Sequence, residues 1–132
     1  MIAVVQRVKS ASVLVDGKII GKIDQGYLIL LGVAKDDTEV DAQFLADKIS
    51  TFRIFSDGDK NMNLSIQDVE GSILVVSQFT LCGDWRKGRR PSFSSSAPPE
   101  KAEQLYLHFS KLLKSNNIPV KTGQFAALMD VE

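Results

Sequence analysis

Two continuous apolar runs constrain the fold of this chain more than any other feature of its sequence. Residues 27–33 read YLILLGV and residues 72–79 read SILVVSQF. Runs of this length, rich in branched apolar residues and preceded by glycine, are typical of strands that are covered on both faces. We therefore expect both segments in the core of the protein, with the remaining elements packed around them.

Helical periodicity follows each of the two runs. The first helix is expected to begin at a capping box formed by Thr38 and Asp41. Its apolar residues recur at helical spacing and are Val40, Phe44, Leu45, Ile49 and Phe52. The second helix is expected to begin at Pro98-Pro99 and to end near Asn116-Asn117. Its buried face is marked by Ala102, Leu105, Phe109, Leu112 and Leu113.

Shorter strand-like segments lie at both ends of the chain. Residues 2–9 and 12–15 are rich in valine, and Asp16-Gly17 then offers the dipeptide that a type I′ hairpin turn favours. Residues 118–121 and 125–131 have strand-like composition as well. Strands interrupted by two helices indicate an α+β fold rather than regular βαβ winding. With 44% hydrophobic residues, the chain can bury one core, so we expect a single domain over residues 1–132.

The charge balance and the cysteine and histidine counts exclude several classes of protein. Sixteen basic and sixteen acidic residues leave no net charge, so a polyanion has to be bound by a local patch. No apolar run approaches the length of a membrane span, which argues against a membrane protein. Cys82 and His108 are the only cysteine and the only histidine. We therefore expect no metal site, no disulfide and a cytoplasmic location.

The segment Ser77-Gln78-Phe79-Thr80 is the first candidate for chemistry. It ends a buried strand and opens into a glycine-containing loop, where backbone amides leave the sheet and become free to bind a ligand. The structural alternative is that Gln78 and Thr80 simply alternate with core residues. Thr80 as a nucleophile needs an adjacent base, and none lies near it in sequence. We interpret His108 as a helix-surface residue and Cys82 as a small packing residue, and assign neither a catalytic role.

A long basic loop follows this segment. The connection between Gly83 and Pro99 is longer than most inside a compact domain, and loops of that length are usually functional or mobile. Its residues that suit phosphate pairing or stacking on a base are Trp85, Arg86, Lys87, Arg89 and Arg90. A solvated basic loop without a ligand is the alternative. Its position directly after residues 77–80 favours a substrate that is small at its reacting end and RNA at the other.

Four segments of the chain, taken in order, resemble the D-aminoacyl-tRNA deacylase family. They are MIAVVQRV at residues 1–8, SQFTL at 77–81, KGRRPSF at 87–93 and TGQFAALMDV at 122–131. The resemblance implies a homodimer with two active sites at the subunit interface. It implies a barrel-like fold of mixed β-sheet layers flanked by two main helices. It also implies hydrolysis of the ester that joins a D-amino acid to tRNA, without a cofactor.

The resemblance also implies roles for individual residues. Those that would be catalytic belong to one motif and are Gln78, Phe79 and Thr80. Ser77 would contact the substrate, and Phe125 and Met129 would form an apolar wall near its adenine or aminoacyl end. Gln6 and Arg7 would support the interface around the pocket. The basic loop at residues 85–90 would bind the tRNA.

One departure from the family pattern concerns the C-terminal end. Family members continue beyond the MDV strand into a segment with a Gly-Pro dipeptide, which inserts into the partner's pocket and excludes L-amino acids. Here the sequence stops at Glu132, and none of its four prolines follows a glycine. We therefore expect a chain without the family's chiral gate, and interpret its end as a truncation.

Two other functions remain open at this point. A nonenzymatic nucleic-acid-binding module would use the basic loop and keep the SQFT segment as plain structure, and it would not hydrolyse an ester. A hydrolase that depends on Cys82 would be inactivated by thiol alkylation. An aminoacyl ester is already activated, so positioning, together with oxyanion stabilisation by the amides of Phe79 and Thr80, would suffice for the enzyme.

Overall fold

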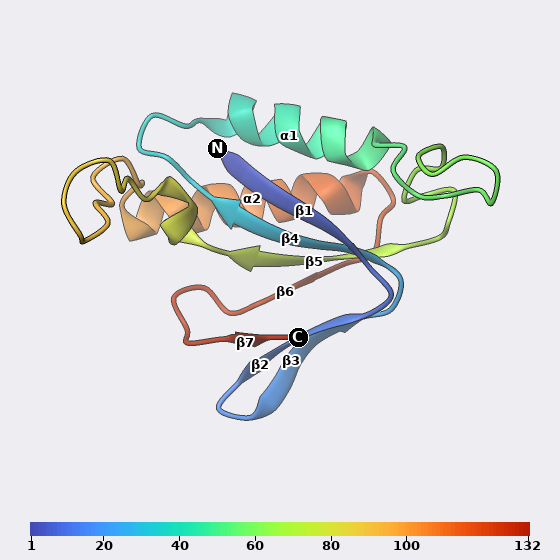
Figure 1. Cartoon of the computed structure of the whole chain (residues 1–132), viewed down its shortest axis with the longest axis horizontal. Coiled ribbons are helices and arrows are strands. Elements are labelled where there is room, and N and C mark those ends of the chain that lie inside the picture. The colour runs from blue at the N-terminus through green and yellow to red at the C-terminus, as the bar shows by residue number, and fades with distance from the viewer.

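The computed structural model describes residues 1–132, in which two helices cover one face of a larger β-sheet and a smaller sheet covers the other (Figure 1). The strands are β1 (Ile2–Val8), β2 (Ala11–Val15), β3 (Lys18–Ile23), β4 (Gly26–Gly32), β5 (Ser72–Ser77), β6 (Val120–Thr122) and β7 (Asp130–Val131). The helices are α1 (Glu39–Thr51) and α2 (Pro99–Ser115), and a 3₁₀ helix, η1 (Phe79–Cys82), follows β5.

The larger sheet has the strand order β1-β4-β5-β6, and the smaller sheet has the order β3-β2-β7. β1 pairs antiparallel with β4, whereas β5 is parallel to both β4 and β6. Each parallel pair is joined through a helix, and α1 and α2 lie on the same face (Figure 1). The expected mixed sheets flanked by two helices are confirmed, but these two βαβ connections were not expected. They bring the carboxyl ends of β4 and β5 to one edge, where binding sites commonly form.

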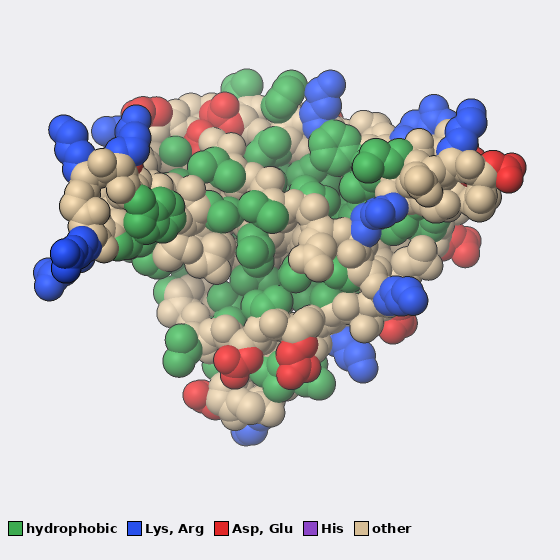
Figure 2. Space-filling view, viewed as in Figure 1, with side chains coloured by type: hydrophobic (Ala, Val, Ile, Leu, Met, Phe, Trp, Pro, Cys, Tyr) green, Lys and Arg blue, Asp and Glu red, His purple; other side chains and the backbone are tan.

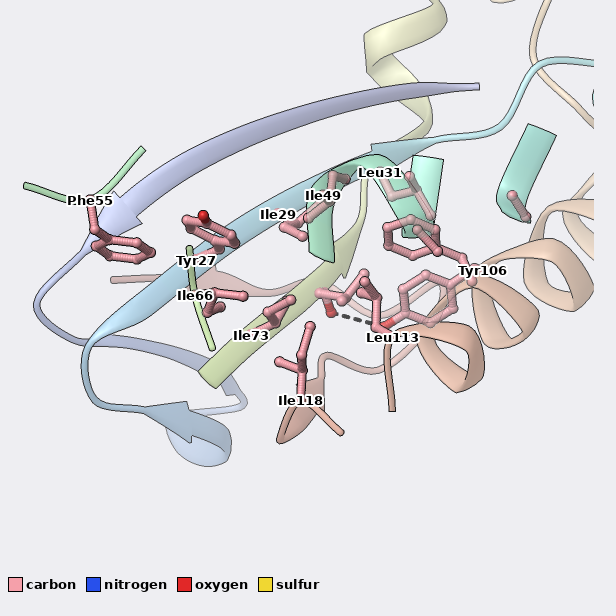
Figure 3. Close-up of a cluster of buried hydrophobic side chains, with 14 residues drawn as sticks. Tyr27, Ile29, Leu31, Ile49, Phe55, Ile66, Ile73, Tyr106, Leu113 and Ile118 are labelled. Carbon is pink, nitrogen blue, oxygen red and sulfur yellow. Dashed lines mark hydrogen bonds between the residues drawn. The ribbon is translucent and has the colours of Figure 1, made fainter. Parts of the chain in front are cut away.

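β5 is buried on both faces, as its apolar run predicts. The helix-facing side chains of β4 and β5, which pack into the main core, are Tyr27, Ile29, Leu31, Ile73 and Val75 (Figure 3). On the opposite face, Leu74 and Val76 pack against Ala11, Val13 and Ile23 at the smaller sheet. This double coverage makes the end of β5 a rigid support for the residues that follow it.

The predicted ends of the helices and of the first hairpin are confirmed. The Asp41 carboxylate accepts hydrogen bonds from the backbone N–H and the hydroxyl of Thr38, which forms the capping box of α1. α2 begins at Pro99 and buries Ala102, Leu105, Phe109 and Leu113. Asp16 and Gly17 have φ angles of +50° and +75°, as a type I′ turn requires.

The predicted buried face of α1 is wrong in part. Val40 and Phe44 are 76% and 61% exposed, whereas Ala42, Ala46 and Ile49 are buried. Ala42, Ala46 and Ile49 make the contact with the core and Leu45 packs against it, whereas Val40 and Phe44 lie on the outer surface of the helix. Apolar spacing alone cannot tell these two faces apart.

Two predicted strands are shorter than expected. β5 ends at Ser77, because the chain turns into η1 from Phe79. Of residues 125–131, only Asp130–Val131 form a strand, and the segment before them contains a turn closed by a hydrogen bond from Ala127 N–H to the Gln124 carbonyl. Both segments border a common cavity instead of continuing along a neighbouring strand. Their strand-like composition does not predict this change of direction.

Candidate active site

A cavity of about 650 Å³ opens at the carboxyl ends of β4 and β5. Its mostly apolar lining is made by Val33, Val76, Ser77, Gln78, Phe79, Phe93, Ser96, Ala97, Pro99, Ala102, Phe125, Ala126, Ala127, Leu128, Met129 and Val131. Cavities of this size and character are typical of small-molecule sites. The structure therefore brings together five residues predicted from the sequence, Ser77, Gln78, Phe79, Phe125 and Met129.

Hydrogen bonds hold the residues that follow β5. The Gln78 N–H donates to the Leu31 carbonyl over 2.8 Å, which continues the pairing of β4 with β5. The side-chain amide of Gln78 donates to the hydroxyl of Thr80. Thr80 does not line the cavity itself and is connected to it through Gln78. The amides of Phe79 and Thr80 are the first two of η1, where N–H groups have no acceptor within the helix.

Two glycines allow η1 to lie close to its neighbours. A Cβ atom on Gly32 would lie 3.0 Å from the Cβ of Leu81 and 3.1 Å from the carbonyl oxygen of Gln78. A Cβ atom on Gly83 would lie 2.8 Å from the ring of Trp85. A larger residue at either position would push η1 away from the end of β4 or from the basic loop.

Aromatic contacts shape two sides of the cavity. The rings of Phe79 and Phe93 pack edge to face, with centroids 5.0 Å apart. The ring of Phe125 lies 6.0 Å from that of Tyr106, whose hydroxyl donates to the Val75 carbonyl over 3.0 Å. Burial raises the pKa of Tyr106 to about 12, so this wall remains uncharged at neutral pH.

The segment before β7 forms the remaining wall. Ala126 has a φ angle of +61°, a left-handed conformation that residues other than glycine rarely adopt. Leu128 lines the cavity although 93% of its surface is exposed, so the cavity is open to solvent on this side. Met129 packs its sulfur against Gly123.

The basic loop after η1 is exposed and lies outside the cavity. The Arg86 guanidinium donates to the Asp84 carboxylate over 2.9 and 2.7 Å, which lowers the pKa of that carboxyl. The remaining cations of the loop, which form no ion pair, are Lys87, Arg89 and Arg90. Trp85 beside them is 61% exposed. Figure 2 shows basic side chains gathered at the end of the molecule where this loop lies.

Gln6 and Arg7 are not brought to the cavity of their own chain. They lie on β1 opposite Leu28 and Tyr27, toward the end of the larger sheet that is remote from η1. The Arg7 guanidinium donates to the carbonyl of Ile54 over 2.6 Å. Gln6 is exposed on the face of β1 that alternates with the helix-covered face.

The other side chains considered for catalysis lie elsewhere. His108 borders a surface hollow with Glu39, Phe44 and Asp47 of α1. Cys82 is buried, and this burial raises the pKa of its thiol, which disfavours the nucleophilic thiolate. No group of three or more His, Cys, Asp and Glu side chains is arranged to hold a metal ion.

Comparison with known proteins identifies the family of the chain. The family described as D-Tyr-tRNA(Tyr) deacylase matches residues 4–132. The chain belongs to this family. A D-aminoacyl-tRNA deacylase of Thermosipho melanesiensis is 61% identical over 99% of this chain and 88% of its own length. One of Fervidobacterium nodosum is 58% identical over 100% of this chain and 89% of its own length.

Solved structures have the fold of this D-Tyr-tRNA(Tyr) deacylase family member. A structure described as a c-Myc DNA unwinding element binding protein matches with a TM-score of 0.90 and 38% identity, over 98% of this chain and 89% of that one. A probable eukaryotic D-amino acid tRNA deacylase matches with a TM-score of 0.83 over 98% and 91%, and at 18% identity it shows the fold alone. The deacylase is thus a hydrolase of D-aminoacyl-tRNA, and the nonenzymatic module is not favoured.

Several parts of the deacylase cavity were not predicted. Phe93 belongs to the KGRRPSF segment, in which only the basic residues indicate a binding role. Val33 and Ala97 carry no chemical signal in the sequence, since small apolar residues are equally common in any core. None of the deacylase helices has the length and apolar character needed to span a membrane.

Proposed function

We propose that ester hydrolysis takes place in the cavity at the ends of β4 and β5, with the ester carbonyl bound by the amides of Phe79 and Thr80. The observation that carries this proposal is the position of η1, whose first residue, Phe79, lines an apolar cavity large enough for an aminoacyl group. Backbone donors placed at a developing oxyanion are among the strongest catalytic devices in acyl transfer. The apolar lining strengthens them because it keeps the local dielectric low.

The nucleophile in this mechanism is a water molecule assisted by the ribose 2′-hydroxyl of the substrate. Water adds to the ester carbonyl carbon, and the two amides stabilise the resulting oxyanion. The carbon–oxygen bond to the ribose then breaks, which releases the D-amino acid and leaves a hydroxyl on the tRNA. Thr80 has an orienting role, since its hydroxyl already accepts a hydrogen bond from Gln78 and no base lies beside it.

The remaining predicted residues bind the substrate. Phe125 and Met129 contact the apolar part of the aminoacyl or adenine group, and Ser77 contributes a polar group to the same wall. The tRNA backbone is contacted by the cations Lys87, Arg89 and Arg90, and a base stacks on Trp85. Arg86 acts mainly through Asp84, which it ties to the loop.

The chain acts as a homodimer in this proposal. β1 is an edge strand, and its side chains Ile2 and Val4 are 42% and 46% exposed. Ile2 and Val4 lie on the same face of the sheet as Leu28 and Leu30, which are only half-buried. Figure 2 shows apolar side chains over the middle of the molecule. Gln6 lies on this face as well, which supports its role at a subunit interface.

The tRNA substrate and the single, buried cysteine favour a location in the cytoplasm.

Substitution of Thr80 tests the mechanism. If Thr80 only orients the site, Thr80→Ala should lower kcat on D-tyrosyl-tRNA by about tenfold and leave tRNA binding unchanged. The matched control is Thr51→Ala at the exposed end of α1, which should leave kcat unchanged. Loss of kcat by about 10⁴-fold or more would revive Thr80 as a covalent nucleophile.

A further inference from the structure

The basic loop leaves and re-enters the body of the molecule at one pair of residues. Asp84 and Ser92 face each other as an antiparallel bridge, and the backbone N–H of each donates to the carbonyl of the other over 2.9 Å. The residues between them, 85–91, are all exposed, and Gly88 turns the chain with a φ angle of +77°. A displacement of the loop therefore reaches the body of the protein through Asp84 and Ser92.

Phe93 follows this pair directly and borders the cavity. It is half-buried, and its ring packs edge to face on Phe79, the first residue of η1. A Cβ atom added to Gly83 would lie 3.1 Å from Cε1 of Phe93 and 2.8 Å from the ring of Trp85, so both rings lie against this glycine. Phe93 thus lies between the base of the loop and the residue whose amide is proposed to bind the ester carbonyl.

The chain beyond Phe93 is tied to the walls of the site. The hydroxyl of Ser95 donates to the carbonyl of Cys82 in η1 over 2.9 Å. The N–H of Ala97 donates to the carbonyl of Val33, directly after β4, also over 2.9 Å. Because this side is held, a displacement of the Phe93 ring has to come from the side of the loop.

Phosphate binding changes the electrostatics of the loop. Lys87, Arg89 and Arg90 are exposed, close together in sequence and without an ion pair. Like charges at such a spacing repel one another, and the phosphates of a bound nucleic acid remove this repulsion. None of the three side chains lines the cavity, so their effect on it has to pass through Phe93. Binding energy from a remote part of a substrate can in this way position groups at the reacting bond.

We propose that Phe93 is a positioning residue that couples phosphate binding at the basic loop to Phe79, so that hydrolysis depends on the tRNA part of the substrate. This inference rests on the cavity being the site of hydrolysis, as proposed above. It follows that a D-aminoacyl ester without tRNA phosphates is a poor substrate even when it saturates the cavity.

The test supplies the two parts of the substrate as separate molecules. D-Tyrosyl-adenosine carries the ester without the tRNA, and tRNA lacking its terminal adenosine, at a concentration that saturates the protein, supplies the phosphates without an ester. We expect the truncated tRNA to raise kcat of the parent chain on D-tyrosyl-adenosine by about tenfold, because it positions Phe79. Phe93→Leu, which stays apolar but loses the aromatic contact, should lower this stimulation to less than about twofold.

The ratio of stimulated to unstimulated kcat is compared, so that a change in the cavity wall itself cancels. Phe93→Tyr keeps the ring and should keep the stimulation. The matched control is Phe52→Leu, the same change at the end of α1, which should respond as the parent chain does. A parent chain that hydrolyses D-tyrosyl-adenosine without stimulation would overturn the inference and leave the proposed function standing. Equal stimulation of Phe93→Leu and the parent chain would overturn it as well.

Absence of hydrolysis by the parent chain would instead contradict the proposed function, and fluorine NMR then tests the coupling without turnover. In protein labelled with 4-fluorophenylalanine, the Phe79 resonance is assigned by its loss in Phe79→Leu. It should shift when the truncated tRNA binds the parent chain, and shift less in Phe93→Leu. A resonance that does not shift, or that shifts equally in both chains, would overturn the inference.

Discussion

Gly32 is the residue at which the end of β4 approaches η1 most closely. An added Cβ atom would meet the Cβ of Leu81 and the carbonyl of Gln78 at about 3 Å, so one of them has to move. Because Gln78 leads into η1 and bonds Thr80, we expect Gly32→Ala to lower kcat/KM for D-tyrosyl-tRNA by about tenfold. Steady-state hydrolysis assays and thermal denaturation of the same preparation measure the effect.

Gly17→Ala is the matched control. It lies in the β2–β3 turn with φ +75°, and its Cβ would meet no atom within 4 Å. Backbone strain should lower the free energy of unfolding by about 1 kcal/mol and leave kcat/KM unchanged. A Gly32→Ala enzyme with parental activity would show that η1 does not have to lie close to β4.

At the scale of residues, the sequence predicts only part of the cavity lining. Ser77, Gln78 and Phe79 are predicted because they end a buried strand, and Phe125 and Met129 because of the family resemblance, and all five line the cavity. Val33, Ala97 and Leu128 could not be found, since which apolar side chain faces a cavity depends on packing between distant segments. The roles assigned to Gln6 and Arg7 depend on a second subunit and stay predictions.

The basic loop is the element whose charge can be changed without affecting the cavity. Arg89→Glu combined with Arg90→Glu should weaken tRNA binding by about tenfold or more and reduce its salt dependence, because two phosphate contacts are lost. Lys18→Glu combined with Lys22→Glu on β3 makes the same change in net charge on exposed positions and serves as control. Filter binding across a salt series distinguishes them, and equal losses in both variants would mean that only overall charge matters.

α2 carries a buried tyrosine that makes stability sensitive to alkaline pH. The folded-state pKa of Tyr106 is raised from 10.0 to about 12, so its contribution is complete below pH 10 and is lost as the pH rises through 12. The loss amounts to about 2 kcal/mol at pH 12. Tyr106→Phe should cost about 1 kcal/mol at pH 7 through the lost hydrogen bond. Its stability should then fall less steeply above pH 10 in urea denaturation, and an unchanged slope would contradict this explanation.

At the scale of elements, local signals were sufficient where they act within one segment. The capping box, the prolines of α2 and the Asp16-Gly17 turn were predicted because each depends on neighbours in sequence. The outer face of α1 and the turn before β7 were not, because Val40, Phe44 and Leu128 have core-like composition at exposed positions. The parallel pairing through α1 and α2 is likewise set by tertiary contacts.

For the whole molecule, the open apolar face of β1 and β4 predicts the oligomeric state. Val4→Asp places a charge in the proposed interface, so it should convert the proposed dimer to a monomer and lower the deacylase activity. Val40→Asp, at an exposed valine on α1, is the matched control and should leave the mass unchanged. Sedimentation equilibrium reads out the mass, and a monomeric parent chain with full activity would contradict the dimer.

The most direct test of the deacylase assignment is the release of D-tyrosine from D-tyrosyl-tRNA, measured beside the L-enantiomer and beside a Gln78→Ala variant. We expect the parent chain to hydrolyse the D-ester well above the spontaneous rate, and Gln78→Ala to hydrolyse it more slowly while binding tRNA equally well. If neither ester is hydrolysed by the folded parent chain, the cavity at the ends of β4 and β5 is not a deacylase site.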